Sequence, residues 1–296
     1  MTRDLLGIAG LDPHEVRALL DRADALADGA PPWSLAGRLV ANLFFEPSTR
    51  TSLSFEIAAR RAGAEVVTFT PEASSLSKGE SLLDTARTVE ALGAEALIVR
   101  HRDTGAPSRV AEALDAAVIN AGDGTGEHPT QGLLDALTLR RRSGRLAGLT
   151  VAIVGDLRHS RVANSNMALL PGQGAFVLAA GPPAFLPDML PTGVERVATV
   201  DEAIARADAL MTLRIQRERL EDSLDLSPFD YHAEWGLSAA RLAARPELPI
   251  LHPGPINRGV EISGEVADDP RRSLILEQVR LGVPTRIACL ERALGV

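Results

Sequence analysis

Phe44-Phe45-Glu46-Pro47-Ser48-Thr49-Arg50-Thr51 is the stretch from which the fold class and the chemistry of this chain can be inferred together. An apolar run over 39–45 leads into it and is typical of a buried strand. Pro47 ends that strand, and Ser48 stands where the N-cap of a helix belongs. Strand, turn and helix thus follow one another directly, which is how a βαβ unit begins.

The segment after Ser48 carries the pattern of a helix. The apolar residues Leu53, Ile57 and Ala58 recur at helical spacing. Gly63 supplies a stop, because glycine readily takes the conformation in which helices end. We therefore expect a helix near 51–62.

The first turn of this predicted helix has the composition of an anion site. The hydroxyl groups of Ser48, Thr49 and Thr51 gather beside backbone N–H groups that lack a helical partner, at the positive end of the helix dipole. Arg50 adds a planar fork of donors that suits phosphate oxygens. Each residue alone would be an ordinary capping or surface residue. Together, directly after a buried strand, they predict a phosphate-binding site.

Lys78 is the single lysine among the 31 basic residues of the chain. Because arginine can replace lysine wherever a solvated positive charge suffices, the retained lysine indicates a site that needs a compact ammonium group. It lies in a polar loop, 74–81, ahead of a predicted helix. Chance survival of one loop lysine is the alternative, and the residues alone leave both open.

Length and charge limit the class of protein. The 296 residues suit one large or two medium domains, and 45% of them are hydrophobic. A formal net charge of −8 argues against general binding of nucleic acid or of an anionic membrane. The sequence has neither a signal-peptide core nor a membrane-spanning run, so we expect a cytoplasmic protein. The single cysteine, Cys289, excludes an internal disulfide framework, and no ligand pattern predicts a metal.

Strand and helix patterns alternate along the chain in two successive series. The first series has strands at 39–45, 65–70, 96–100 and 117–121, with helices near 51–62, 80–92 and 108–115. The second has strands at 149–154, 175–180, 194–198, 209–213 and 249–251, and a helix near 131–143 joins the two series. This alternation predicts an α/β fold of two similar domains, each a parallel sheet flanked by helices, with the active site in the interdomain cleft.

Helices are also predicted at both ends of the chain. The first helix has Asp12 as its N-cap, Pro13 at its first position and Glu15 two residues later. The last twenty residues are helical in pattern and are expected to pack back on the first domain. The predicted domains are therefore 1–130, completed by about 275–296, and 131–274.

Five further polar clusters follow predicted strands, where α/β proteins place function. They are Arg100-His101-Arg102, the segment 122–131 with His128 and Gln131, the segment 155–161 with Arg161, Arg214-Ile215-Gln216, and His252–Arg258. Each alone would be an ordinary turn or a solvated charge. Other motifs are missing: there is no Gly-Lys-Ser/Thr phosphate loop, and the turn after Val154 lacks the glycine pair of a dinucleotide site. Ser48 has no evident general base, so a covalent serine mechanism is unsupported.

With these residues assembled, the chain closely resembles the catalytic chains of the aspartate carbamoyltransferase family, within the aspartate/ornithine carbamoyltransferase superfamily. The resemblance runs nearly end to end. Its motifs agree in order and spacing: Phe44–Thr51, Ser74 with Lys78-Gly79-Glu80, Arg100-His101, His128–Gln131, Gly155-Asp156-Leu157 with Arg161, Arg214 with Gln216, and His252–Ile262.

The resemblance implies a transferase of de novo pyrimidine biosynthesis. Its members move the carbamoyl group of carbamoyl phosphate to the amine of L-aspartate, giving N-carbamoyl-L-aspartate and phosphate. Direct attack is implied, with no covalent enzyme intermediate, no cofactor and no metal. The resemblance also implies a carbamoyl-phosphate domain followed by an aspartate domain, and a homotrimer with shared active sites. It leaves open whether regulatory chains or a dihydroorotase are further partners.

Carried over by position, the resemblance assigns residues to each substrate. Carbamoyl phosphate would be held by Ser48, Thr49, Arg50, Thr51, Ser74, Lys78, Arg100, His128 and Gln131. Aspartate would be held by Lys78, Arg161, Arg214, Gln216, Gly254 and Pro255. The catalytic groups would be Arg50, Thr51, Lys78, Arg100, His128 and Gln131, with Ser74 and Lys78 lent by a neighbouring subunit. Glu46 and Arg219 would take part in domain closure.

Two alternatives compete with this assignment. An ornithine or related carbamoyltransferase would need acidic partners for the side-chain ammonium of ornithine, whereas Arg161 and Arg214 suit a dicarboxylate. That branch also has a cysteine after the His252 position, where this chain has Gly254-Pro255. A non-catalytic scaffold relative would have lost cluster members, and all are present.

Departures from the family pattern are few. Asn164 stands where relatives often carry arginine, and Ser81 stands where threonine is common. Neither residue is expected to touch a substrate, and the sequence leaves open whether Asn164 changes the support of Arg161.

Overall fold

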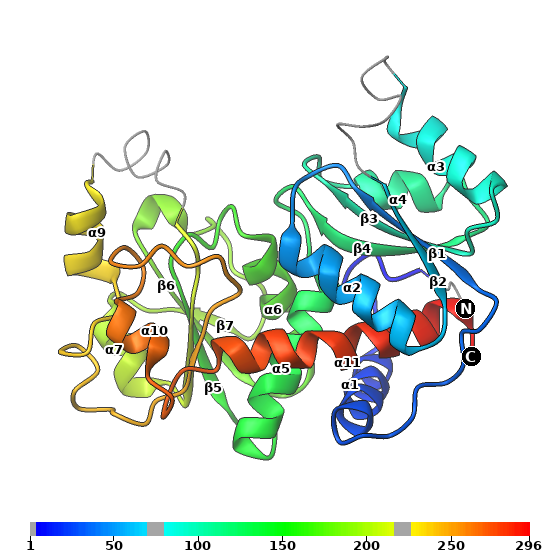
Figure 1. Cartoon of the computed structure of the whole chain (residues 1–296). Coiled ribbons are helices and arrows are strands. Elements are labelled where there is room, and N and C mark those ends of the chain that lie inside the picture. Colours follow the sequence, from blue (N-terminus) through cyan, green and yellow to red (C-terminus); the bar gives the residue numbers. More distant parts are fainter. Residues whose placement is uncertain (1–3, 70–79, 216–225) are drawn as a thin grey trace. The chain divides into compact units, whose positions relative to one another are not determined.

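The computed structural model of the chain describes residues 4–69, 80–215 and 226–296, and the chain divides into two compact units (Figure 1). Unit 1 comprises residues 1–137 and 279–296, and unit 2 comprises residues 138–278. Each unit contains one parallel sheet with helices packed on it. The predicted α/β fold of two domains, each a parallel sheet flanked by helices, is confirmed. The predicted domain boundaries and the placement of the site in an interdomain cleft stay predictions.

Four parallel strands form the sheet of unit 1 in the order β2-β1-β3-β4. They are β1 (Leu39–Phe44), β2 (Glu65–Phe69), β3 (Ala96–His101) and β4 (Ala117–Asp123). Residues of β1, β3 and β4 are buried nearly throughout, as is usual for a parallel sheet covered on both faces. The chain runs from β1 to β2 on one side and then returns to β3 on the other. This order creates a topological switch point between β1 and β3.

The helices of unit 1 surround this sheet. They are α1 (Pro13–Ala27), α2 (Thr49–Arg61), α3 (Leu82–Ala91) and α4 (Ala106–Ala111), while α5 (Pro129–Ser143) begins in the unit and α11 (Ile275–Leu294) ends in it. α2 packs on β1 and β2, and α4 packs on β3 and β4. α1 begins as predicted, because the Asp12 side chain accepts a hydrogen bond from the backbone N–H of His14 and Pro13 is the first helical residue.

The face of α2 that is buried is not the one that carries the aliphatic residues Leu53 and Ile57. Phe55 and Ala58 are fully buried, whereas Leu53 and Ile57 are 52% and 42% exposed. Residues 51, 55, 58 and 59 recur at intervals of four, three and one, so they form a single stripe on a helix with 3.6 residues per turn. Leu53 and Ile57 form another stripe on the outside.

Two ion pairs attach the C-terminal helix α11 to α1 within unit 1. Glu291, which is fully buried, accepts hydrogen bonds from Arg22 Nε and Nη2, both at 2.7 Å. Arg292 Nε donates to Oε1 of Glu15 at 2.6 Å. The end of the chain is therefore part of the same compact unit as its beginning.

Unit 2 has a five-stranded parallel sheet in the order β7-β6-β5-β8-β9. The strands are β5 (Thr150–Val154), β6 (Phe176–Ala180), β7 (Val194–Arg196), β8 (Ala209–Thr212) and β9 (Ile250–Leu251). The helices are α6 (Arg161–Gly172), α7 (Val200–Arg206), α9 (Pro228–Trp235) and α10 (Gly264–Asp268), with a short 3₁₀ turn, η3 (Pro183–Phe185). Here the chain leaves β5 toward β6 and β7, then returns to β8 on the other side. The switch point of this sheet therefore lies between β5 and β8.

The predicted strands and helices that fall on described residues are present, within a few residues of their predicted ends. The segment 74–78, with the predicted site residues Ser74 and Lys78, lies outside the described residues, as do Gln216 and Arg219. Along the described ranges, no helix is long and apolar enough to cross a membrane.

Candidate functional site

The phosphate-site stretch lies at the switch point of the first sheet. Phe44 pairs with Arg100 in the parallel register of β1 and β3, so the residues after β1 and the end of β3 lie side by side. Ligands of open α/β sheets bind at this kind of position, beyond the carboxyl ends of the strands where the strand order reverses. The two cationic residues Arg50 and Arg100 are thus carried by adjacent segments of the same sheet edge.

Ser48 is the N-cap residue of α2, as predicted. Its backbone is extended, with φ −159° and ψ 91°, and within the described part of the chain its hydroxyl makes no capping hydrogen bond. The N–H groups of the first helical turn have no acceptor inside the helix, which leaves them suited to an anion. Thr51 is buried at 6% exposure, whereas Thr49 and Arg50 are exposed.

Arg100 is 9% exposed, and its guanidinium group is held from two sides. Nη1 donates to the carbonyl oxygen of Ala121 at 3.1 Å, and Nη2 donates to Oε1 of Glu46 at 3.3 Å. Ala121 belongs to β4 and Glu46 follows β1, so the guanidinium group bridges the ends of neighbouring strands. A cation that is desolvated and fixed in this way interacts strongly with a nearby anion. Glu46 is a partner of Arg100 here, and its role in domain closure stays a prediction.

The segment that carries His128 and Gln131 leaves the end of β4 and begins α5. Asp123 anchors it, because its carboxylate accepts hydrogen bonds from the backbone N–H groups of Gly105 at 2.7 Å and of Glu127 at 2.8 Å. Gly124 is required in this turn: its φ is +41°, and a Cβ there would lie 2.7 Å from the carbonyl oxygen of Arg102. His128 is 3% exposed and Gln131 is 8% exposed.

His101 belongs to the same sequence cluster as Arg100, and its surroundings favour the neutral form of the imidazole. Burial lowers its pKa below the usual value of 6.5, and Arg109 and Arg102 act in the same direction against the opposing charge of Asp103. The backbone N–H of Asp103 donates to Nδ1 at 2.9 Å, so the ring proton of the neutral form lies on Nε2.

In unit 2 the second cationic cluster lies at the switch point between β5 and β8. Arg161 is the first residue of α6, whose N-cap Ser160 accepts a hydrogen bond from the N–H of Ala163. Arg214 is exposed and follows β8. Because β5 and β8 are paired in parallel register, their carboxyl ends meet at one edge of the sheet. The sheet therefore brings the segments of Arg161 and Arg214 to the same edge.

Asp156 is the second residue after β5 and orders the turn toward α6. Its side chain is buried, and it accepts hydrogen bonds from the backbone N–H of His159 at 3.2 Å and from His159 Nδ1 at 2.9 Å. Gly155 has φ +128°, and its carbonyl oxygen lies 2.3 Å from where a Cβ on Gly181 would stand. The turn is thus too close-packed for a side chain at Gly181.

A buried hydrogen-bond network supports the loop that contains Gly254 and the cis Gly254-Pro255 bond. His252 Nδ1 accepts from the Gly254 N–H at 2.7 Å, and His252 Nε2 donates to Glu261 Oε1 at 3.0 Å. The same Oε1 accepts from the Asn257 N–H at 2.6 Å, and Asn257 Nδ2 donates to the Ile215 carbonyl at 2.7 Å. Since Ile215 follows Arg214, this loop and Arg214 lie at the same edge of the sheet.

Asp135 and Glu261 were not predicted as site residues, yet Asp135 contacts Gln131 and Glu261 contacts the loop of Gly254. Asp135 accepts a hydrogen bond from Gln131 Nε2 at 2.8 Å, and Glu261 supports the loop of Gly254 as described above. A signal for Asp135 was present, because residues four apart on a helix face one another. Glu261 had no local signal, since its contacts depend on how the loop folds back.

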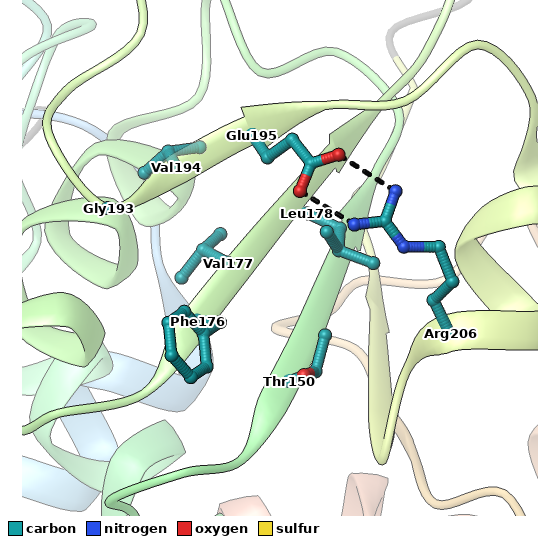
Figure 2. A pocket seen from close by; sticks show the side chains of 8 residues that line it. All are labelled: Thr150, Phe176, Val177, Leu178, Gly193, Val194, Glu195 and Arg206. Carbon is teal, nitrogen blue, oxygen red and sulfur yellow. Dashed lines mark hydrogen bonds and ion pairs between the residues drawn. The ribbon is translucent and has the colours of Figure 1, made fainter.

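A separate cavity lies at the amino-terminal ends of β5 and β6 in unit 2 (Figure 2). It is lined by Thr150, Phe176, Val177, Leu178, Gly193, Val194, Glu195 and Arg206. Arg206 and Glu195 form an exposed ion pair across it, with Nη2 and Oε2 2.6 Å apart (Figure 2). None of the predicted site residues within the described ranges lines this cavity, which lies at the opposite end of the strands from the cationic cluster.

The chain matches two family models in succession. Residues 3–141 match the aspartate/ornithine carbamoyltransferase, carbamoyl-P binding domain, and residues 147–292 match the aspartate/ornithine carbamoyltransferase, Asp/Orn binding domain. Together these matches span nearly the whole chain.

Curated relatives and solved structures agree with the family models. Chains named aspartate carbamoyltransferase catalytic subunit from Granulibacter bethesdensis and from Myxococcus xanthus are each 53% identical to this chain. The first alignment covers 97% of this chain and 93% of the relative, and the second covers 98% of both.

Among solved structures, aspartate transcarbamoylase from Trypanosoma cruzi in complex with N-(phosphonacetyl)-L-aspartic acid is 32% identical, with a TM-score of 0.86 over 97% of this chain and 94% of that chain. The catalytic subunit of M. jannaschii aspartate transcarbamoylase is 31% identical, with a TM-score of 0.86 over 99% of this chain and 98% of that chain. The order of the motifs, the two switch-point clusters and these similarities together show that the chain belongs to the aspartate/ornithine carbamoyltransferase family.

Proposed function

We propose that this chain is an aspartate carbamoyltransferase, which transfers the carbamoyl group of carbamoyl phosphate to the amine of L-aspartate in pyrimidine biosynthesis. The observation that carries the proposal is the pair of arginine-bearing clusters, one at the switch point of each sheet. Two small anions need two such cationic sites. The similarity to chains named aspartate carbamoyltransferase catalytic subunit supports the choice of substrates.

Carbamoyl phosphate is bound by residues of unit 1. Ser48, Thr49, Arg50 and Thr51 hold the phosphate group at the first turn of α2, where backbone N–H groups and the helix dipole favour an anion. Arg100, His128 and Gln131, with Thr51, hold the carbamoyl group. The buried, doubly anchored guanidinium of Arg100 suits this role, because a fixed donor needs no reorganisation when charge develops on the carbonyl oxygen.

Aspartate is bound by residues of unit 2, with Arg161, Arg214 and Gln216 facing its two carboxylates and Gly254-Pro255 close to it. Arginine forms bidentate hydrogen bonds with carboxylates, so this set favours a dicarboxylate over an amino acid with a cationic side chain. This is the physical reason for preferring aspartate to ornithine.

The reaction needs no protein nucleophile. The amine of aspartate attacks the carbonyl carbon of carbamoyl phosphate, and the carbonyl oxygen becomes an oxyanion. The C=O bond then re-forms as the bond to phosphate breaks, and phosphate leaves with the bonding electron pair and takes up the proton that the amine loses. Arg50, Thr51, Lys78, Arg100, His128 and Gln131 are the groups proposed to stabilise these charges. Holding both substrates in a productive geometry lowers the activation barrier further, because the entropy cost of bringing them together is met on binding.

The proposed working form is a homotrimer in the cytoplasm, in which Ser74 and Lys78 complete the site of a neighbouring subunit. Glu46 and Arg219 belong to the charge network of domain closure. Regulatory chains or a dihydroorotase are partners to be sought by co-purification.

A substrate-pair assay tests the proposed function. Purified protein is incubated with carbamoyl phosphate and either L-aspartate or L-ornithine, and the carbamoylated product and phosphate are measured. We expect equal amounts of N-carbamoyl-L-aspartate and phosphate from the first pair only. Product from ornithine would reassign the chain to the other branch, and no product from either pair would favour a non-catalytic relative. The Arg60→Met variant, which removes an exposed arginine far along α2, is the control.

A further inference from the structure

Gln131 and Asp135 form a buried hydrogen-bonded pair on α5. Gln131 Nε2 lies 2.8 Å from Asp135 Oδ1, and the two residues are 8% and 0% exposed. They are four positions apart on the helix, where side chains meet. Pairs of this kind on a solvated helix surface stabilise the helix slightly, whereas this pair is removed from water and next to the proposed carbamoyl site.

A buried cation compensates the charge of Asp135. Arg286, on α11 of the same unit, is 3% exposed. Burial lowers its pKa to about 10, and the charge of Asp135 opposes the shift, so the guanidinium stays protonated at neutral pH. Its Nη1 donates to Ser54 Oγ at 3.0 Å and to the Gly282 carbonyl at 3.2 Å. A nearby opposite charge favours the ionised form of a carboxylate, and an ionised carboxylate only accepts hydrogen bonds.

The charge of Asp135 determines which end of the Gln131 amide faces the ligand. A carboxylate can pair only with the NH₂ end of an amide, because the carbonyl end has no proton to donate. Nε2 is therefore held by Asp135, and Oε1 is the polar atom that remains for a ligand. Gln131 is then presented as an acceptor.

We infer that Asp135 is a positioning residue that makes the carbamoyl site selective for a ligand bearing an NH₂ group. Through Gln131, it discriminates carbamoyl phosphate from acetyl phosphate, in which a methyl group replaces the NH₂. This inference rests on the proposed function, because it takes Gln131 as a contact of the carbamoyl group. The Gln131 Oε1 accepts a hydrogen bond from the NH₂ of carbamoyl phosphate, whereas the methyl of acetyl phosphate leaves this buried acceptor unpaired.

The expected discrimination follows from the cost of an unpaired buried acceptor. Mutational data on such groups correspond to roughly 10- to 100-fold in affinity. Asp135→Asn removes the charge and keeps the shape. The asparagine can donate to Gln131 Oε1 as readily as it accepts from Nε2, so both orientations of the Gln131 amide become available. The preference for NH₂ over methyl should then fall by about tenfold or more.

The experiment measures dissociation constants of carbamoyl phosphate and acetyl phosphate by calorimetry on the full chain without aspartate. The quantity of interest is the ratio of the two constants, because a general loss of anion affinity or of folding changes both constants together. Wild type should bind carbamoyl phosphate at least tenfold more tightly than acetyl phosphate. Absence of carbamoyl-phosphate binding in wild type would refute the proposed function itself. Binding of both ligands with equal affinity would refute this inference and leave the proposed function standing.

Variants then separate positioning from simple stabilisation. Asp135→Asn should lower the ratio, and Asp135→Ser, which also lacks the charge, should do the same if the asparagine variant folds poorly. Gln131→Met removes the acceptor and should abolish the preference, after which adding Asp135→Asn should change the ratio no further. Glu291→Gln removes the charge of another buried carboxylate of unit 1 and should lower stability while leaving the ratio unchanged. A ratio that stays at the wild-type value in both Asp135 variants would overturn the inference.

Discussion

The buried ion pair between Arg22 and Glu291 leads to a prediction about how unit 1 is held together. Glu291 is 0% exposed, and both its oxygens are engaged: Oε2 by Arg22 Nε, and Oε1 by Arg22 Nη2 and the backbone N–H of Trp33, all at 2.7 Å. The guanidinium also lies 4.2 Å above the centre of the Trp33 ring. Arg22→Met removes the cation and leaves the carboxylate buried.

The magnitude follows from these contacts. Removing one partner of a buried ion pair costs about 3–5 kcal/mol, because the remaining charge is left without compensation. The Arg22 side chain retains 16% exposure, so we expect the lower end, about 3 kcal/mol. The double variant Arg22→Met with Glu291→Met should be less destabilised than Arg22→Met alone, since it leaves no buried charge. The sign of this difference distinguishes an uncompensated charge from lost packing.

The assay uses the two tryptophans of the chain, Trp33 in unit 1 and Trp235 in unit 2. In a Trp235→Phe background the fluorescence of Trp33 reports the unfolding of unit 1 alone, and urea titration gives its free energy of unfolding. Arg60→Met, which breaks an exposed i,i+4 pair with Glu56, is the matched control and should cost about 0.3–0.5 kcal/mol. A loss below about 1 kcal/mol for Arg22→Met, or a double variant less stable than the single one, would refute the reasoning.

Four further predictions concern the site. Lys78→Arg should lower turnover by at least about 100-fold and leave the free energy of unfolding unchanged, because a wide planar group replaces a compact ammonium. Near-wild-type turnover of this variant would refute the inference that the site needs a lysine. Arg214→Ala should weaken aspartate binding strongly and leave the affinity for carbamoyl phosphate within a few fold of wild type, as measured by calorimetry. A loss of affinity for carbamoyl phosphate alone would show that Arg214 binds carbamoyl phosphate and not aspartate. Because burial depresses the pKa of His101, the folded state binds its proton less readily than the unfolded state, so stability is lost as pH falls below about 6.5. His101→Gln should reduce that loss in thermal unfolding between pH 7 and pH 5, and an unchanged pH profile would contradict the assignment. Mixed trimers of Arg50→Ala and Lys78→Gln chains should recover roughly a quarter of wild-type activity if each site uses two subunits of a ring. If hybrid trimers are shown to form by mass spectrometry and are inactive, shared sites are excluded.

Local patterns were enough to establish the fold class and the positions of the site segments. The apolar run ending at Phe44, the proline at 47 and the N-cap at Ser48 predicted a strand, a turn and a helix, and the structure has β1 and α2 there. These signals are readable because strand and helix periodicity, proline geometry and capping depend on residues a few positions apart. The placement of Arg100 at the carboxyl end of a strand was readable for the same reason.

The strand order was decided by tertiary structure. The residues near Phe44 and Val154 do not indicate that β3 pairs with β1 or that β8 pairs with β5. These long-range pairings create the two switch points, and so they turn separate arginine-bearing segments into two compact cationic clusters. The sequence placed these segments at strand ends, and the strand order within each sheet placed the segments of that unit at one edge.

The exposed face of α2 and the contacts of buried charges also required the tertiary structure. Leu53 and Ile57 are aliphatic yet exposed, because the position of the sheet selects the stripe of α2 that is buried. Asp135 and Arg286 are charged yet buried, because α5 and α11 bring them together across a long separation in sequence. Hydrophobicity and spacing are properties of a segment, whereas burial and the pairing of charges depend on which other segment covers it.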